Sequence, residues 1–306
     1  MQLSRRLDTS EPVSIALSLA PLRRGPADPA VVVDDGRWWL GTRMATGAAT
    51  LCLQQVGTQV IEAHAWGPGA EERLASLPDL LGAHQSPGQF PGGHPHVVDA
   101  ARRFPGLRIP ATGRVLEALV PAVLEQRVLG VDAFASWRRL LTAHGGPAPG
   151  PAPSRLRVPP SGEQWAGLAS WQWHRAGVDP QRYRTAQRCA RVAPQLERVA
   201  ARGDHEATYR ALRSIAGVGV WTAAEVGGRA LGDTDAVPFG DYHLGHLVGS
   251  ALLGQRLHVD DHAGIAEALE HSRPHRLVAL RLLELSPHVT LERRGPRRSR
   301  MDHRAH

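Results

Sequence analysis

The hydrophobic pattern changes its period part-way along the chain, and this change constrains the fold more than any other feature. Through residues 11–66 apolar residues alternate with polar or small ones, as in Val13, Ile15, Leu17 and Leu19, and a period of two predicts strands. After residue 95 the apolar residues recur at the spacing of amphipathic helices. We therefore expect a small α+β unit followed by a larger helical one.

The first part carries clear turn signals. Asp34-Asp35-Gly36 separates two apolar runs and predicts a hairpin, and Gly57-Thr58 joins two further strands over 50–56 and 59–66. A short helix with four leucines on one side closes this unit, at Leu74, Leu77, Leu80 and Leu81. The Gly/Pro/His-rich stretch from Ser86 to Pro95 then predicts a linker.

The second part predicts helices over 114–130, 132–143, 180–201, 206–215, 220–231, 241–253, 262–271 and 275–285. A Pro/Gly segment, His144 to Ser161, interrupts them and is interpreted as an ordered loop because tryptophans follow it. The predicted organisation is an N-terminal α+β domain over 1–88, a helical domain over 89–290 and an Arg-rich flexible tail over 291–306.

Charge and composition narrow the chemistry. The net charge of +7 and a pI near 10.7 favour a polyanionic partner. Every one of the 36 Lys+Arg residues is an arginine, so no side-chain amine can form a Schiff base. Two cysteines are too few for a disulfide framework or an iron–sulfur cluster, and no histidine spacing matches a zinc pattern. We expect neither a catalytic metal nor a cofactor.

The start of the chain and its hydropathy bear on its location. No apolar signal-peptide core follows Met1, and no run of about 18 apolar residues, the length needed to span a bilayer, occurs in the chain. We therefore expect a soluble, cytoplasmic and nucleoid-associated protein that does not contact a membrane.

The strongest local motif is the string of residues 212–223, Leu-Arg-Ser-Ile-Ala-Gly-Val-Gly-Val-Trp-Thr-Ala. One helix ends near Ile215, a two-glycine turn follows, and a second helix starts near Val220. Gly217 and Gly219 can both adopt positive φ and let the backbone approach another body closely. The amides at the start of the second helix suit a phosphate group. An ordinary tight turn between helices is the alternative.

Asp241 lies 22 residues after Gly219, follows Gly240 and precedes an apolar-periodic stretch. Its position predicts a helix N-cap near the positive end of the helix dipole. A carboxylate at this point can also take part in chemistry, and the two roles are compatible. Asp233 and Asp235 are interpreted as loop or capping residues.

Three segments together resemble one protein family. Residues 215–223 resemble the hairpin of the helix-hairpin-helix DNA glycosylases, and residues 235–244 are similar to the segment that carries their essential aspartate. Residues 116–126 resemble a helix that ends in a glutamine facing DNA. The pattern is most similar to the 3-methyladenine DNA glycosylase II group, and the likeness runs from about residue 10 to residue 285.

The resemblance implies roles for particular residues. Asp241 becomes the catalytic carboxylate, which stabilises positive charge on the sugar and orients or deprotonates water. The residues implied to contact DNA are Gln126, Arg127, Val128, Gly217, Gly219, Val220 and Thr222. The carbonyls of Ile215 and Val218 are implied to hold a monovalent cation. The implied base pocket contains Trp221, Tyr242 and Ser272, with core packing as the alternative for Trp221.

Departures from the family pattern set the details. Relatives that also cleave the strand carry a lysine where this chain has Trp221, which implies a glycosylase without lyase activity. Arg127 or Val128 stands where a leucine wedges into the duplex. Ser272 and His275 replace two tryptophans of the second pocket wall, and Trp171, Trp173 or Tyr242 are alternatives for that wall.

We thus expect a monomeric, monofunctional glycosylase that flips and removes alkylated purines from damaged double-stranded DNA in base excision repair. Two alternatives remain open. One is a glycosylase-like DNA-binding protein with altered or lost activity, and the other is a glycosylase for a different, bulkier lesion.

Overall fold

The computed structural model describes residues 2–86, 93–287 and 289. The predicted Arg-rich tail over 291–306 lies outside the described residues, as does most of the predicted linker. Among the described residues no helix is long and apolar enough to cross a bilayer.

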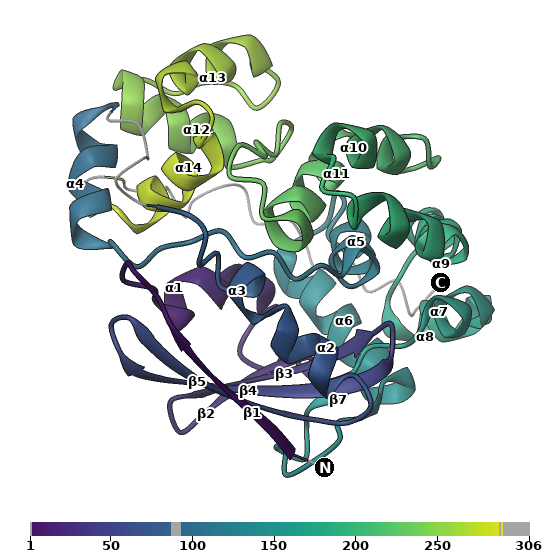
Figure 1. The fold of residues 1–306 in the computed structure, drawn as a ribbon. Coiled ribbons are helices and arrows are strands. Elements are labelled where there is room, and N and C mark those ends of the chain that lie inside the picture. The colour runs from purple at the N-terminus through teal and green to yellow at the C-terminus, as the bar shows by residue number, and fades with distance from the viewer. Residues whose placement is uncertain (1, 87–92, 288, 290–306) are drawn as a thin grey trace.

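An antiparallel sheet forms the base of the molecule, with helices layered above it (Figure 1). Its strand order is β1-β5-β4-β3-β2. The strands are β1 (Gln2–Asp8), β2 (Val31–Asp34), β3 (Arg37–Met44), β4 (Gly47–Gly57) and β5 (Val60–Trp66). The predicted hairpin is present, and Asp35 and Gly36 at its turn both have positive φ, 48° and 70°. Such a turn matches the twist of the strands it joins.

The two faces of the sheet pack against different parts of the chain. Leu51 and Leu53 of β4 belong to the main core, whereas Cys52 between them packs on the opposite face with Leu156. Leu156 lies in the Pro/Gly segment, which returns to the sheet and pairs β6 (Gly146–Pro147) with β7 (Arg157–Val158). The segment is therefore an ordered cover for the outer face of the sheet.

One predicted strand is wrong. Residues 15–19 form the helix α1 (Ile15–Leu19), capped by Ser14, whose hydroxyl accepts from the amide of Leu17. The buried residues are Ile15, Ser18 and Leu19, which is helical rather than alternating spacing. A short run that alternates in sequence fits both periods, and packing decides between them. The fifth strand is β1, which the period did not indicate.

All the helices predicted beyond residue 113 have a counterpart, but three further helices, over 95–103, 162–167 and 170–176, were not predicted. Short helices cover the inner face of the sheet: α2 (Ala70–Ala75) and α3 (Leu77–Leu80). The others are α4 (Pro95–Arg103), α5 (Val115–Leu124), α6 (Gly130–His144), α7 (Gly162–Gly167), α8 (Ser170–Ala176), α9 (Pro180–Ala200), α10 (His205–Arg213), α11 (Val220–Val226), α12 (Leu244–Val248), α13 (His262–Ala268) and α14 (Arg276–Leu285). Both α11 and α12 continue into π-helical turns, Gly227–Leu231 and Gly249–Leu253.

The described residues form two large apolar cores. The main core joins the sheet to α5, α6, α9 and α11, so the two predicted domains share it. The second core joins α4 to the C-terminal helices α12, α13 and α14. The loop between α11 and α12 therefore runs from one core to the other, and Asp241 lies in this loop.

Candidate functional site

The predicted hairpin lies between α10 and α11. Gly217 has φ 98°, and a Cβ there would collide with the hydroxyl of Thr185 on α9, so a glycine is required. The positive φ expected at Gly219 is absent, because its φ of −99° and ψ of −172° are extended and any residue could adopt them. Val220 begins α11 with 49% of its side chain exposed. The hairpin thus presents Gly219 and Val220, at the start of α11, to solvent.

Gln126, just after α5, is hydrogen-bonded to this hairpin. Its side-chain nitrogen donates to the carbonyl of Gly217 and to the hydroxyl of Thr222, both at 2.9 Å. Thr222 is only 2% exposed, so its side chain supports the hairpin instead of reaching solvent. The carbonyl of Ile215 accepts from the amide of Val218 at 2.9 Å and tightens the same turn.

The turn between α5 and α6 is held by residues from distant elements. Arg182 of α9 donates to the carbonyl of Leu124 at 2.7 Å, and Arg24 pairs with Glu125 at 3.2 Å. Arg127 then follows in the left-handed region with φ 55°, and its side chain is exposed. Few non-glycine residues adopt this conformation, and its occurrence at a turn beside the hairpin favours a functional position. Val128 is half-buried.

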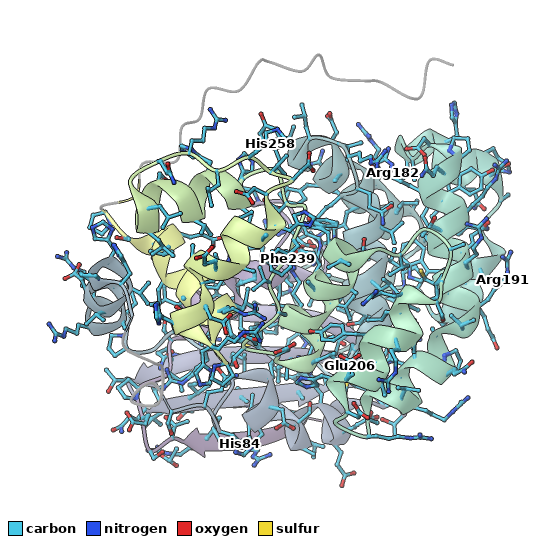
Figure 2. The ribbon with its side chains drawn as sticks, turned by 90° about the horizontal axis from the view of Figure 1, so that it is seen from above. His84, Arg182, Arg191, Glu206, Phe239 and His258 are labelled. Atoms are coloured by element: carbon cyan, nitrogen blue, oxygen red, sulfur yellow. The ribbon has the colours of Figure 1, made fainter. Side chains whose placement is uncertain are left out.

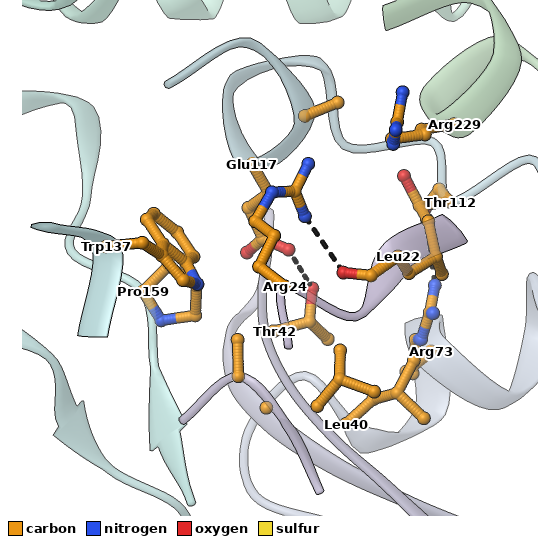
Figure 3. Close-up of a pocket in the computed structure, with 14 residues that line it drawn as sticks. Leu22, Arg24, Leu40, Thr42, Arg73, Thr112, Glu117, Trp137, Pro159 and Arg229 are labelled. Carbon is orange, nitrogen blue, oxygen red and sulfur yellow. Dashed lines mark hydrogen bonds between the residues drawn. The ribbon is translucent and has the colours of Figure 1, made fainter. Parts of the chain in front are cut away.

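The N-terminal unit reaches this turn through Arg24. Its guanidinium lies 5.9 Å from the ring of Trp137, and the Asp28 carboxylate accepts from the Arg24 amide and the Trp137 indole. A cavity of about 60 Å³ opens beside Arg24, between the sheet and α5 (Figure 3). The polar side chains around it include Arg73, Glu117 and Arg229. The sheet unit therefore buttresses the end of α5.

Asp241 is half-buried and held by two donors. The indole nitrogen of Trp221 donates to Oδ2 at 3.2 Å, and the amide of His243 donates to Oδ1 at 2.8 Å. Helix α12 begins only at Leu244 and has His243 as its N-cap, so the predicted N-cap role of Asp241 is wrong. The carboxylate is fixed by a turn of the loop and by Trp221.

Two glutamates lie close enough to Asp241 to be affected by its charge. Burial raises the pKa of Glu225 and the pKa of Glu284, and the charge of Asp241 contributes to both increases. Arg229 pairs with Glu225. Among the described residues no guanidinium forms an ion pair with Asp241 itself. A carboxylate placed in this way can stabilise a positive charge that develops beside it.

Two further aspartates anchor the loop that carries Asp241. Asp233 accepts from the hydroxyl of Tyr209 on α10. Asp235 accepts from the guanidinium of Arg276 at 2.8 and 2.7 Å and from its amide at 3.1 Å. No sequence pattern predicts these anchors, because the partners lie 24 and 41 residues away. The loop is tied to the hairpin helix on one side and to α14 on the other.

The predicted pocket residues do not all lie at the surface. Tyr242 is 60% exposed beside Asp241, whereas Ser272 is 6% exposed. In the view from above, Phe239 lies between the helices α12–α14 and the hairpin helices (Figure 2). Burial lowers the pKa of His275, although the charge of Asp235 opposes this, and its ring contacts the Thr234 hydroxyl at 2.9 Å.

The tryptophans suggested as alternative walls lie elsewhere. Trp173 is fully buried and stacks with Trp165 and Tyr183 at centroid distances of 5.4 and 6.4 Å, so it is a core residue. Trp171 is 62% exposed on α8. Within residues 2–86, 93–287 and 289 no group of three or more His, Cys, Asp or Glu is arranged to hold a metal ion.

Sequence comparison finds curated relatives but no family model that matches. Over 176 residues, 57% of this chain, the sequence is 32% identical to a protein of Mycobacterium tuberculosis named as a probable bifunctional transcriptional activator/DNA repair enzyme AlkA. The chain spans only 35% of the length of that relative.

Solved structures share the architecture over most of the chain. A 3-methyladenine DNA glycosylase from Archaeoglobus fulgidus superposes with a TM-score of 0.78 at 19% identity, covering 92% of this chain and 97% of that one. An 8-oxoguanine glycosylase/lyase from Clostridium acetobutylicum, in complex with DNA, gives 0.66 at 11% identity, covering 92% and 96%. These likenesses confirm the predicted fold class, a helical domain preceded by a small α+β unit.

Proposed function

We propose that this chain, which has the fold of the helix-hairpin-helix DNA glycosylases, is a monofunctional DNA glycosylase that removes alkylated purines from double-stranded DNA. The observation that carries the proposal is the hydrogen bond from Trp221, in the second helix of the hairpin, to the Asp241 carboxylate. Relatedness to AlkA and to a 3-methyladenine glycosylase supports the substrate class.

In the proposed mechanism, the hairpin and the turn at Arg127 bind the DNA backbone while the damaged nucleotide leaves the stack. Unstacking costs a few kcal/mol and least for a damaged base. The Arg127 side chain, exposed in its left-handed turn, fills the gap in the duplex. Gln126 holds the hairpin in place, because both of its side-chain hydrogen bonds go to the hairpin.

Asp241 acts when the glycosidic bond breaks. Positive charge then grows on the sugar, and the Asp241 carboxylate stabilises it and orients the attacking water. The Trp221 and His243 hydrogen bonds fix the carboxylate before the substrate arrives, so little reorganisation is needed. An alkylated purine already carries positive charge, which makes it a good leaving group and favours stacking on an aromatic ring such as Trp221 or Tyr242.

The side chains available support a reaction without a lyase step. A β-lyase of this type needs an amine to form a Schiff base with the sugar, and the chain contains no lysine. Trp221, which the family resemblance places at the lysine position, instead donates a hydrogen bond to Asp241. The proposed product is therefore an intact strand with an abasic site.

Base release from methylated duplex DNA tests the proposal. Wild-type protein should release 3-methyladenine or 7-methylguanine and leave the strand uncut, and borohydride should trap no covalent complex. Asp241→Asn should abolish release, whereas Asp260→Asn, a control on the exposed surface, should not. Release of only another lesion, such as 8-oxoguanine, would contradict the substrate assignment. Equal release by wild type and Asp241→Asn would contradict the catalytic assignment.

A further inference from the structure

One face of α9 carries a row of exposed arginines. They lie at intervals of four, three, seven and four residues, so all fall on the same side of the helix. We call this row the arginine stripe: Arg184, Arg188, Arg191, Arg198 and, just after the helix, Arg202. At a rise of 1.5 Å per residue the stripe is about 27 Å long.

The stripe has no counter-charges of its own. Within the described part of the chain none of its arginines forms an ion pair. The acidic residues of this helix are used on other faces: Asp179 binds Arg182, and Glu197 accepts from the amides of Val115 and Leu116 at 3.1 Å. Like charges at this spacing destabilise a helix. The stripe therefore costs stability unless an anionic partner covers it.

The position of the stripe indicates which kind of anion binds to it. The guanidinium of Arg188 donates to the carbonyl of Ala216 in the hairpin at 3.3 Å, and Thr185 packs directly against Gly217. The row therefore begins beside the hairpin. Arg191 lies at the outer edge of the molecule, whereas Arg182 of the same helix points inward to α5 (Figure 2).

We propose that the arginine stripe binds the phosphate backbone of the duplex beyond the hairpin. This rests on the proposed DNA-binding function and extends it to a second length of DNA. Phosphates along one strand are spaced by about 3.4 Å of helix axis, so a stripe of this length matches about eight base pairs. Guanidinium groups suit phosphates because they donate two hydrogen bonds in a fixed plane.

The test is the salt dependence of DNA affinity for a variant that loses the far part of the stripe. Arg191, Arg198 and Arg202 are changed together to Gln, which leaves the hairpin contact of Arg188 in place. Each lost phosphate contact should reduce the slope of log K against log salt by about 0.9, so up to about 2.7 in total. The control changes to Gln three other exposed arginines that have no ion-pair partner in the described part of the chain: Arg37, Arg102 and Arg155.

Affinity is measured on two undamaged duplexes, one just long enough for the hairpin and one extended by about ten base pairs. The stripe variant should lose slope on the long duplex and not on the short one, and the control variant should lose it on neither. An equal loss on both duplexes, or an equal loss in the control, would show that the arginines act only through net charge and would overturn the proposal. Because no base is excised, failure of the glycosylase assignment would appear separately, as DNA binding by the stripe without base release.

Discussion

The indole nitrogen of Trp221 donates a hydrogen bond to Oδ2 of Asp241 across 3.2 Å. Trp221 is the second residue of α11, and Asp241 lies in the loop that leads to α12. The bond therefore joins the hairpin, the proposed DNA-binding element, directly to the proposed catalytic group. A tryptophan in this place has two properties that can be separated by mutation, its ring and its N–H group.

Trp221→Phe should keep an aromatic ring and lose the donor. A hydrogen bond to a charged group is worth about 1.5–3 kcal/mol, so we expect excision to slow by about 10- to 100-fold while affinity for duplex DNA changes little. Single-turnover base release with enzyme in excess measures the step. Trp171→Phe, on the exposed face of α8, is the control and should match wild type. Equal rates for Trp221→Phe and wild type would mean that the bond does not position Asp241.

The sequence predicted correctly those turns whose backbone conformation depends only on neighbouring residues. The Asp35-Gly36 turn and the hairpin glycine Gly217 are specified within a few residues, because positive φ demands particular residue types. Asp241 could be located by its spacing from the hairpin. Its N-cap role was wrong, since the loop turns once more before α12 begins at Leu244.

Contacts between segments far apart in the chain could not be predicted from the sequence. The bonds from Tyr209 to Asp233 and from Arg276 to Asp235 depend on how three helices pack, and no periodicity reports this. The role of Trp173 could not be predicted either, because an aromatic residue near a loop can line a pocket or pack in the core. Its stacking on Trp165 identifies it as a core residue.

Tyr209→Phe should weaken catalysis by loosening the loop that carries Asp241. The substitution removes only the hydroxyl that Asp233 accepts from, so the ring packing of α10 is kept. We expect a lower single-turnover excision rate at saturating enzyme, by up to about 10- to 100-fold, because a hydrogen bond to a charged group is worth about 1.5–3 kcal/mol. Tyr183→Phe is a matched control, since that ring stacks on Trp173 and no hydrogen bond of its hydroxyl is found among the described residues.

Thermal stability and affinity for an abasic-site duplex distinguish positioning from damage to the fold. If Tyr209→Phe lowers the melting temperature and the DNA affinity together with the excision rate, the hydroxyl only stabilises the fold. A slower rate with unchanged affinity supports a positioning role.

Gly217 and Gly219 should respond differently to the same substitution. Gly217→Ala places a Cβ at positive φ and against Thr185, which costs about 1–2 kcal/mol and displaces the hairpin. The backbone at Gly219 is extended, and a Cβ there would meet no described residue within 4 Å, so the fold should tolerate Gly219→Ala. Chemical denaturation of both variants measures the difference. Equal destabilisation would show that the hairpin does not depend on the left-handed conformation at Gly217.

The ion pair between Asp235 and Arg276 should make the free energy of unfolding depend on pH in the acid range. Partial burial alone would raise the pKa of Asp235, but the hydrogen bonds and charge of Arg276 outweigh it and hold this pKa below its ordinary value of 3.8. A carboxyl whose pKa is lower in the folded state stabilises the fold above its unfolded pKa and ceases to do so as the pH falls through its folded pKa. Asp235→Asn removes this dependence.

We therefore expect Asp235→Asn to be less stable than wild type by about 2 kcal/mol near neutral pH, because Arg276 loses a charged acceptor. The gap should stay constant down to about pH 5 and narrow as the pH falls through the ordinary pKa of 3.8, because unfolded wild type then binds a proton that the folded protein does not. Urea denaturation of both proteins between pH 3 and 7 measures the gap. A gap that stays constant to pH 3 would show that folding leaves the pKa of Asp235 unchanged, which would contradict an ion pair that lowers this pKa in the folded protein.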